Sequence, residues 1–457
     1  MFRQICVHAL AMALAGTTTF AQEPASSSKA KNVIFLIADG WGFNHIEATN
    51  YFQFGELGHQ PYETGFEKLG MSTFSINGGY DVDQAWSSYE YFKLKAADSA
   101  ATATTMSSGV KTLDGRIGVD AEGKPVRGIV EHAHDLGKAT GVITTVQMSH
   151  ATPAAFASHN DARKNYEQIG HEMIQESKIN VLMGAGHPYF DNDGKLIATQ
   201  EADGSWTTKG KYDVVGGIAT WQQVVEGKAG ADIDGDGEAD PWMLIDSREE
   251  FQKMATGDTP KRVLGIAPVP ETLQASRTGV DDKREDDLPY QTPLLETSPT
   301  AAEMIAAALN VLDNNDKGFV LVAESGGAVD WASHANAMGR MIEEMAAFGD
   351  AVQAVTQWVE SNSNWDETLV IVTGDHECGY LWGEGSDPDW IPIQNKGKGN
   401  LPGFKWGKTS HSNHLIPCFV RGAGSDAVVA LADQTDKRVG KFLDNAELGK
   451  VLFEVLK

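Results

Sequence analysis

Five short apolar runs, each stopped by polar residues, constrain the fold of this chain more than any other feature. They are rich in β-branched side chains, are bounded by glycine, and lie at residues 31–40, 139–152, 179–188, 318–330 and 367–379. Continuous runs of this kind are typical of parallel strands buried on both faces. Helical patterns lie between them, such as the apolar face from Met341 to Val359. The alternation predicts an α/β fold with a large, mostly parallel sheet.

The region from about residue 188 to 296 differs from the rest, because it is acidic, rich in glycine and poor in strong strands. We therefore expect an inserted cap region beside the sheet. A helix should follow this region, with Ser298 as its N-cap and Pro299 at its first helical position.

The first 21 residues have the pattern of a secretory signal peptide. Arg3 precedes an apolar stretch, and Thr19, Phe20 and Ala21 form a small-x-small cleavage motif. Cleavage near Ala21 would place the protein in the periplasm or outside the cell. Two alternatives are then open for the remaining cysteines, Cys378 and Cys418: one disulfide, or two buried free thiols.

The strong negative charge excludes some partners. The formal net charge is −26, and removal of the signal peptide, which carries Arg3 and no acidic residue, makes it −27. Such a chain repels nucleic acid and anionic membranes, and no 18-residue apolar run follows the signal peptide. An anionic substrate would need strong local positive charge, which metal ions can supply.

Polar residues with metal-ligand chemistry follow the apolar runs. Asp39, Asp375 and His376 come directly after two of them, and Asp330 and His334 share one face of a helix at i and i+4. Either His411 or His414 lies shortly before another apolar run. Because ligands of open α/β sheets bind beyond the carboxyl ends of the strands, we expect these side chains to converge. Carboxylate and imidazole ligands suit zinc.

The stretch KAADSAATATTMSSGVKT, residues 95–112, places Asp98 and Ser99 before a run of small residues. Asp98 or Ser99 is an ordinary helix N-cap in one interpretation. In the other, Ser99 is an exposed nucleophile at a helix N-terminus that approaches a bulky anion.

Five segments together give the chain a resemblance to the alkaline phosphatases from about residue 31 to 425. They are FLIADGWG (35–42), ADSAATAT (97–104), HATPAAFASH with ARK (150–164), VDWASH (329–334), and GDHE with TSHSN (374–413). The resemblance implies a three-layer αβα sandwich, with residues 22–457 forming a single catalytic domain that contains the acidic insertion. It also implies an exported, metal-dependent phosphomonoesterase.

The resemblance assigns a role to each site residue. Ser99 would be the nucleophile, Arg163 would clamp two phosphate oxygens, and Asp98 would orient Arg163. One zinc ion, which activates Ser99, would be held by Asp39, Asp375 and His376. The second zinc ion, which binds the leaving-group oxygen, would be held by Asp330, His334 and His411.

A third metal site, usually magnesium, departs from the family pattern. His150 and Thr152 fit a variant that carries histidine. The expected Glu, five residues before Asp330, is Ser325, and Glu324 lies one position too early. Either a one-residue bulge brings Glu324 to the ion or the site is altered; we favour the altered site.

A calcium site is a further possibility in DIDGDGEADP, residues 232–241. Asp232, Asp234 and Asp236 alternate as in a calcium loop, but Met243 stands where the bidentate Glu is expected. A solvated acidic turn is the alternative.

The leading hypothesis is hydrolysis of small phosphate monoesters through a phosphoserine intermediate, with release of inorganic phosphate at alkaline pH. A phosphodiesterase or sulfatase on the same metal scaffold is the alternative, and a non-catalytic zinc or phosphate binder is a third. The family resemblance also makes a homodimer possible.

Overall fold

A computed structural model describes residues 29–201, 204, 206–279, 287–326 and 329–456. The predicted signal peptide, residues 1–21, lies outside the described residues. Among the residues described, no helix combines the length and apolar composition needed to cross a membrane.

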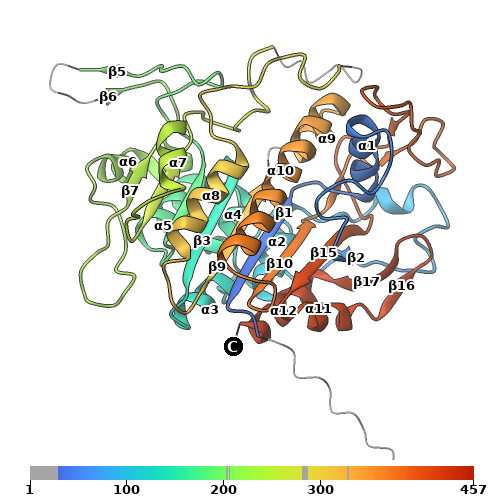
Figure 1. Cartoon of the computed structure of the whole chain (residues 1–457), viewed down its shortest axis with the longest axis horizontal. Helices are drawn as coiled ribbons and strands as arrows, with labels where there is room; N and C mark the ends of the chain where they lie inside the picture. The colour runs from blue at the N-terminus through green and yellow to red at the C-terminus, as the bar shows by residue number, and fades with distance from the viewer. Residues whose placement is uncertain (1–28, 202–203, 205, 280–286, 327–328, 457) are drawn as a thin grey trace, which may run out of the picture.

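The five apolar runs form five adjacent parallel strands, as predicted from the sequence. They occupy the middle of an 11-stranded sheet with the order β16-β17-β2-β15-β10-β1-β9-β3-β4-β8-β7 (Figure 1). Their bounds are β1 Asn32–Ala38, β3 Ala139–Gln147, β4 Val181–Ala185, β9 Phe319–Ser325 and β10 Thr368–Gly374. All four pairings among them are parallel.

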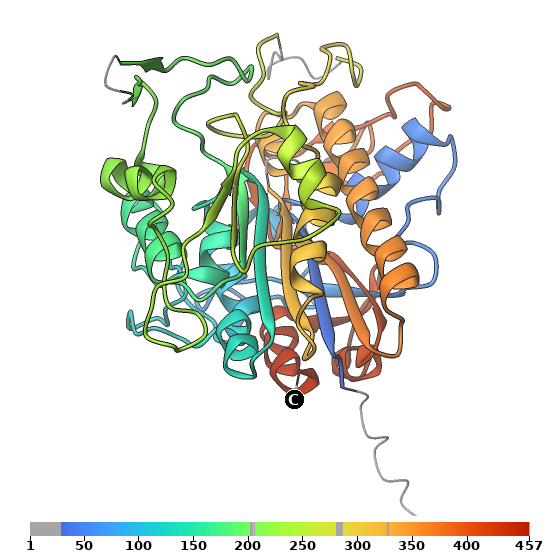
Figure 2. The same ribbon diagram turned by 60° about the vertical axis from the view of Figure 1, so that its left-hand side comes forward.

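Helices cover both faces of the sheet, which gives the predicted three layers (Figures 1 and 2). Along β1, Val33, Phe35 and Ile37 pack into one core and Ile34 and Leu36 into the other. The first core contains residues of α2 Ser99–Ser108, α3 Ile129–Asp135, α4 Ala151–Ala157, α5 Tyr166–Gln175, α6 Gly217–Val225, α11 Ser425–Leu431 and α12 Asn445–Val455. The second contains residues of α1 Phe43–Gln53, α7 Arg248–Met254, α8 Ala301–Leu312, α9 Val329–His334 and α10 Met338–Asn362.

The sheet is mixed at one edge. β15 Ile416–Gly422 runs antiparallel to β10 and to β2 Glu67–Ser72, and β17 Gly440–Asp444 pairs with β2 and with β16 Gln434–Asp436. Short two-stranded sheets lie outside it: β5 Thr199–Gln200 with β6 Trp206–Thr207, β11 Glu377–Cys378 with β14 His411–Ser412, and β12 Leu381–Trp382 with β13 Lys405–Trp406.

Residues 188–296 do not lie wholly beside the sheet. β7 Met243–Ile245 and β8 Val263–Ile266 extend the sheet from β4, and all three pair in parallel. The β5–β6 pair stands away from the sheet in both views (Figures 1 and 2). The strand β8 has only four residues, all of them buried, so its apolar run is too short to predict a strand clearly from the sequence.

Two local expectations are settled by the structure. The N-cap of α8 is Thr300 rather than Ser298. The Thr300 hydroxyl accepts from the Glu303 amide, and the Glu303 carboxylate accepts from the Thr300 amide. Cys378 and Cys418 are both buried free thiols, so the disulfide alternative is wrong.

Candidate active site

Strand register brings the predicted polar residues to one place. Ala38, the last residue of β1, pairs with Gly374 of β10 on one side and with Ser325 of β9 on the other. The three strands therefore end at the same level. Asp39 and Asp375 follow two of these ends, and their side chains meet beyond the carboxyl edge of the sheet.

Asp39, Asp375 and His376 form the first cluster, which is completely buried. His376 Nε2 lies 3.5 Å from Asp39 Oδ1 and 3.2 Å from Asp375 Oδ2. Asp375 Oδ1 accepts from two backbone amides, of Gly40 and His376. No described residue donates a hydrogen bond to Asp375 Oδ2 or to either oxygen of Asp39. Burial and then the charge of Asp330 raise the pKa of Asp375 to about 6, and burial holds that of Asp39 well above its usual value.

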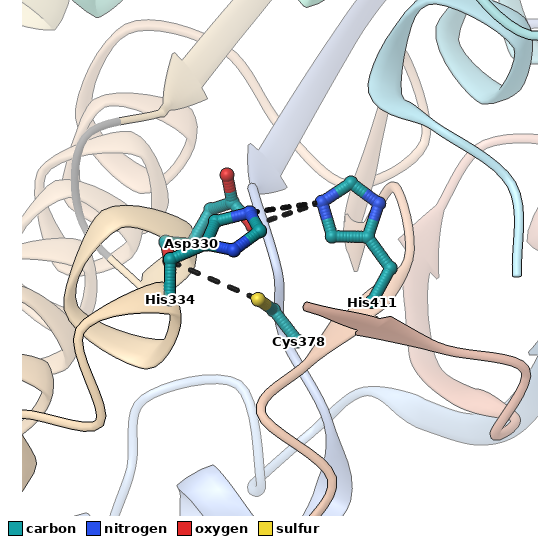
Figure 3. Close-up of side chains that lie close together, drawn as sticks. All are labelled: Asp330, His334, Cys378 and His411. Carbon is teal, nitrogen blue, oxygen red and sulfur yellow. Dashed lines mark hydrogen bonds and ion pairs between the residues drawn. The ribbon is translucent and has the colours of Figure 1, made fainter. Parts of the chain in front are cut away.

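Asp330, His334 and His411 form the second cluster (Figure 3). Helix α9 places Asp330 and His334 on one face, and His411 comes from β14. Each histidine has its Nδ1 against a backbone carbonyl, that of Thr409 or Ala97, so each Nε2 is left to face Asp330. The side chain of His334 is 41% exposed, so this cluster opens to solvent while the first does not.

The structure places His411, and not His414, in the second cluster. His414 is buried among Trp86, Phe92 and Trp382, and its Nδ1 lies 2.8 Å from its neighbour's carbonyl oxygen.

The third predicted site contains Asp39, His150 and Glu324, whose ligand atoms lie within 4.8 Å of one another. Glu324 therefore reaches this site although it lies six positions before Asp330. The Thr144 hydroxyl donates to Glu324 Oε2, and Thr152 is close enough to lower the pKa of Glu324. Burial outweighs these bonds and raises that pKa to about 8. Ser325 is also buried, and its hydroxyl oxygen has no hydrogen-bond partner among the described residues.

Ser99 opens helix α2 beside the first cluster. Its Oγ lies 3.1 Å from His376 Nε2, and the residue is 1% exposed. Asp98 is the N-cap of α2, because its Oδ1 accepts from the Ala101 amide. Its Oδ2 accepts from Arg163 NH1, and Arg163 NH2 lies 3.2 Å from His150 Nε2. The small side chains of α2 let the helix pack closely against α4 and α12.

The donor sets fit metal ions on two grounds. Buried carboxylate oxygens of Asp39, Asp330 and Asp375 have no hydrogen-bond partner in the described part of the chain. In the second cluster, the two Nε2 atoms lie 3.2 Å apart and are 3.3 and 3.4 Å from Asp330 Oδ1. Tetrahedral zinc with bonds of about 2.05 Å has ligand–ligand edges of about 3.3 Å.

Comparison with known families identifies the chain. The sequence model of the alkaline phosphatase family matches residues 30–401. The chain belongs to the alkaline phosphatase family. It is accordingly an enzyme, a phosphoric monoester hydrolase.

Curated relatives match this alkaline phosphatase over most of their length. Alkaline phosphatase 4 of Bacillus subtilis (strain 168) is 28% identical over 446 residues, covering 93% of this chain and 81% of the relative. Alkaline phosphatase H of Pseudomonas aeruginosa (strain UCBPP-PA14) is 30% identical over 430 residues, covering 90% and 84%.

Solved alkaline phosphatases share the fold. The enzyme from the Antarctic bacterium TAB5 has a TM-score of 0.61 at 24% identity, covering 94% of this chain and 98% of its own. The cold-active enzyme of a psychrophilic Shewanella has a TM-score of 0.65 at 22% identity, covering 93% and 100%.

One member of the second cluster was missed in the sequence. The Cys378 sulfur lies within 4.8 Å of the ligand atoms of Asp330, His334 and His411 (Figure 3). Its position in the sequence, two residues after His376 and in the same loop as the Asp375–His376 pair, could have indicated that Cys378 lies near the metal-ligand residues.

The acidic loop gathers a different set from the one expected. Asp232, Asp234 and Asp240 bring carboxylate oxygens within 4.8 Å of one another, and Asp236 is not among them. Lys261 Nζ bonds to Asp234 and Asp240, which places an ammonium group beside two of the three carboxylates.

Proposed function

We propose that this alkaline phosphatase hydrolyses phosphate monoesters through a phosphoserine formed on Ser99, at alkaline pH. The observation that carries the proposal is the position of Ser99 Oγ, 3.1 Å from His376 Nε2 at the N-terminus of α2. This hydroxyl lies at a metal-ligand cluster and beside a helix end that favours anions.

Asp39, Asp375 and His376 would hold one zinc ion, and Asp330, His334 and His411 the other. Two such ions supply positive charge beside the entering and leaving oxygens of an in-line displacement. The solvent-open second cluster is the side from which substrate and water approach.

The chain's own residues perform the remaining steps. Ser99 releases its proton to solvent, its Oγ bonds to phosphorus as the bond from phosphorus to the ester oxygen breaks, and that oxygen takes a proton from water and leaves as an alcohol. Water then cleaves the Oγ–P bond, which releases inorganic phosphate and restores Ser99. Arg163, held by Asp98, offers a fork of N–H groups to two phosphate oxygens, which a monoester presents more freely than a diester. This clamp favours the monoesterase over a phosphodiesterase or sulfatase.

The third site would hold magnesium or another divalent ion through Asp39, His150 and Glu324, with Thr152 beside them. An imidazole ligand suits zinc better than magnesium, so we expect weak magnesium binding. A variant of the TAB5 enzyme, in which aspartate replaces a histidine, is described with Mg in a site called M3 at 23% identity. We also propose that the chain is exported, as its first 21 residues predict.

The test compares p-nitrophenyl phosphate with bis-p-nitrophenyl phosphate at pH 7 and 9, before and after chelation of the zinc-loaded protein. Monoester turnover that rises with pH and is lost on chelation is the expected result. In an acid quench, the wild type should retain labelled phosphate bound covalently to the protein. Ser99→Ala should have the same zinc content as the wild type but retain no labelled phosphate. Faster turnover of the diester, or trapped phosphate in Ser99→Ala, would overturn the proposal.

A further inference from the structure

Cys378 points into the second cluster because of how its strand pairs. β11 and β14 run antiparallel, with Cys378 opposite His411 and Glu377 opposite Ser412. Directly opposed residues extend to the same face of a strand pair. One face therefore carries Cys378 and His411 toward Asp330 (Figure 3). On the other face, the Ser412 hydroxyl donates to the Glu377 carboxylate.

The Cys378 side chain is completely buried, and its thiol has one weak partner. Its sulfur lies 3.8 Å from the backbone carbonyl oxygen of Asp330. Its backbone is fixed, since the Cys378 amide donates to the carbonyl oxygen of Gly40 at 3.0 Å. The sulfur is thus held at the cluster by the strand and is bound only loosely by the carbonyl.

Three ligands already have the spacing of three corners of a tetrahedron, as the edges between Asp330, His334 and His411 indicate. The sulfur lies within 4.8 Å of all three ligand atoms. A zinc–sulfur bond of about 2.3 Å puts a sulfur corner about 3.6 Å from the other ligands. Each sulfur–ligand separation therefore exceeds the edge of such a tetrahedron by no more than about 1.2 Å.

We propose that the Cys378 sulfur is a fourth ligand of the metal ion held by Asp330, His334 and His411. On binding, the thiol releases its proton to solvent, its contact with the Asp330 carbonyl breaks, and a sulfur–metal bond forms. This inference rests on the metal site of the proposed function, and it adds a soft sulfur ligand to one hard carboxylate and two borderline imidazoles.

Two consequences follow from a thiolate at this corner. Four protein ligands close a tetrahedral site, so the ion becomes available to a leaving group only when the sulfur withdraws or the ion expands to five ligands. A sulfur ligand also shifts metal preference toward soft ions, so cadmium should compete for this site better than magnesium or manganese does.

The test uses cobalt, whose bond to a thiolate gives a near-ultraviolet charge-transfer band that oxygen and nitrogen ligands do not give. Metal-free protein is loaded with cobalt, and the band and the bound cobalt are measured in the wild type and in Cys378→Ser. Cys418→Ser is the matched control, because Cys418 is also buried and free but lies in β15, outside the cluster.

The band should be present in the wild type and in Cys418→Ser and absent in Cys378→Ser. If the wild type binds cobalt at this site without the band, the sulfur ligand is refuted and the proposed function still stands. His334→Ala shows whether the site is occupied: if it binds as much cobalt as the wild type, the site holds no metal and the proposed function fails with the inference. Should Cys378→Ser not fold, X-ray absorption of the wild-type zinc protein decides, by the presence or absence of a sulfur neighbour at about 2.3 Å.

Discussion

Asp98 joins the start of helix α2 to Arg163 through its two carboxylate oxygens. Oδ1 accepts from the Ala101 amide at 3.0 Å, and Oδ2 accepts from Arg163 NH1 and the Gly115 amide, each at 3.0 Å. The residue that caps the helix of the proposed nucleophile, Ser99, therefore also holds Arg163, the proposed phosphate clamp. Both interpretations of Asp98 made from the sequence, as an ordinary cap and as an orienting residue, describe the same side chain.

Asp98→Asn should separate these two roles. Asparagine caps helices as well as aspartate, but its single carbonyl oxygen cannot serve both the cap and Arg163, and its NH2 group would meet Arg163 as a second donor. We expect the free energy of unfolding to change by less than about 1 kcal/mol, while inhibition by inorganic phosphate weakens by about tenfold or more through loss of a charged hydrogen bond. Inhibition constants and urea unfolding measure the two effects.

Thr300→Ala is the matched control, because Thr300 caps α8 through the same kind of bond. It should lose about 1 kcal/mol of stability and no activity. Unchanged phosphate inhibition in Asp98→Asn would contradict the orienting role.

Arg163→Lys should weaken phosphate binding although it preserves the charge. Lysine offers a point charge in place of the planar fork, and it would lose either the Asp98 contact or a phosphate contact. We expect the inhibition constant of inorganic phosphate to rise by about 10- to 100-fold. Arg127→Lys, in a surface pair with Asp135, should leave it unchanged. Equal effects of the two substitutions would show that Arg163 contributes charge alone.

The central strands and the convergence of polar residues at their ends could be predicted from local pattern, whereas the division of these residues into two clusters came from the family resemblance. A buried parallel strand has a continuous apolar run, and its end fixes where the next residue, such as Asp39, will lie. The Asp330–His334 pair needed only the helical spacing of α9. The choice of His411 came from the family resemblance, since His414 has the same chemistry.

Other features depend on contacts that local pattern does not encode. Counting back five residues from Asp330 led to Ser325 and favoured an altered third site, whereas the structure brings Glu324, one residue earlier, to Asp39 and His150. Glu324 lies opposite Thr144 in the register of β9 beside β3. Cys378 joins its cluster through a two-residue strand pair, which is too short to have a periodic signal. In the acidic loop, Asp240 replaces Asp236 because the Asp240 carboxylate turns back to the Ile233 amide and to Lys261.

Glu324→Gln and Ser325→Ala should distinguish the two candidates for the third site. Glu324 shares a group of potential metal ligands with Asp39 and His150, and the buried hydroxyl of Ser325 has no hydrogen-bond partner in the described part of the chain. Glu324→Gln should lower the affinity for the activating divalent ion by at least about tenfold, and Ser325→Ala should not change it. The magnesium dependence of the rate, together with metal content, measures this. A loss in Ser325→Ala alone would assign the ion to the serine.

Removal of the metal ions should make stability depend on pH between 7 and 9. Burial raises the pKa of Glu324 to about 8 in the metal-free fold. Burial alone would lower the pKa of His411, but its ion pair with Asp330, at 3.4 Å, raises it to about 9. In the unfolded state, both groups have lost most or all of their protons by pH 7. Between pH 7 and 9 the folded state therefore releases more protons than the unfolded state does. The stabilisation of the folded state therefore falls as pH rises, by on the order of 1 kcal/mol per pH unit.

Bound cations keep the carboxylates ionised, and higher pH favours metal binding because fewer protons compete for the ligands. The difference in free energy of unfolding between the zinc-loaded and metal-free proteins should therefore widen from pH 7 to pH 9. Urea unfolding of both forms at the two pH values measures it. Glu324→Gln should flatten the slope of the metal-free protein, because glutamine has no proton to release. A difference that stays constant or narrows would mean that the folded metal-free site does not retain these protons.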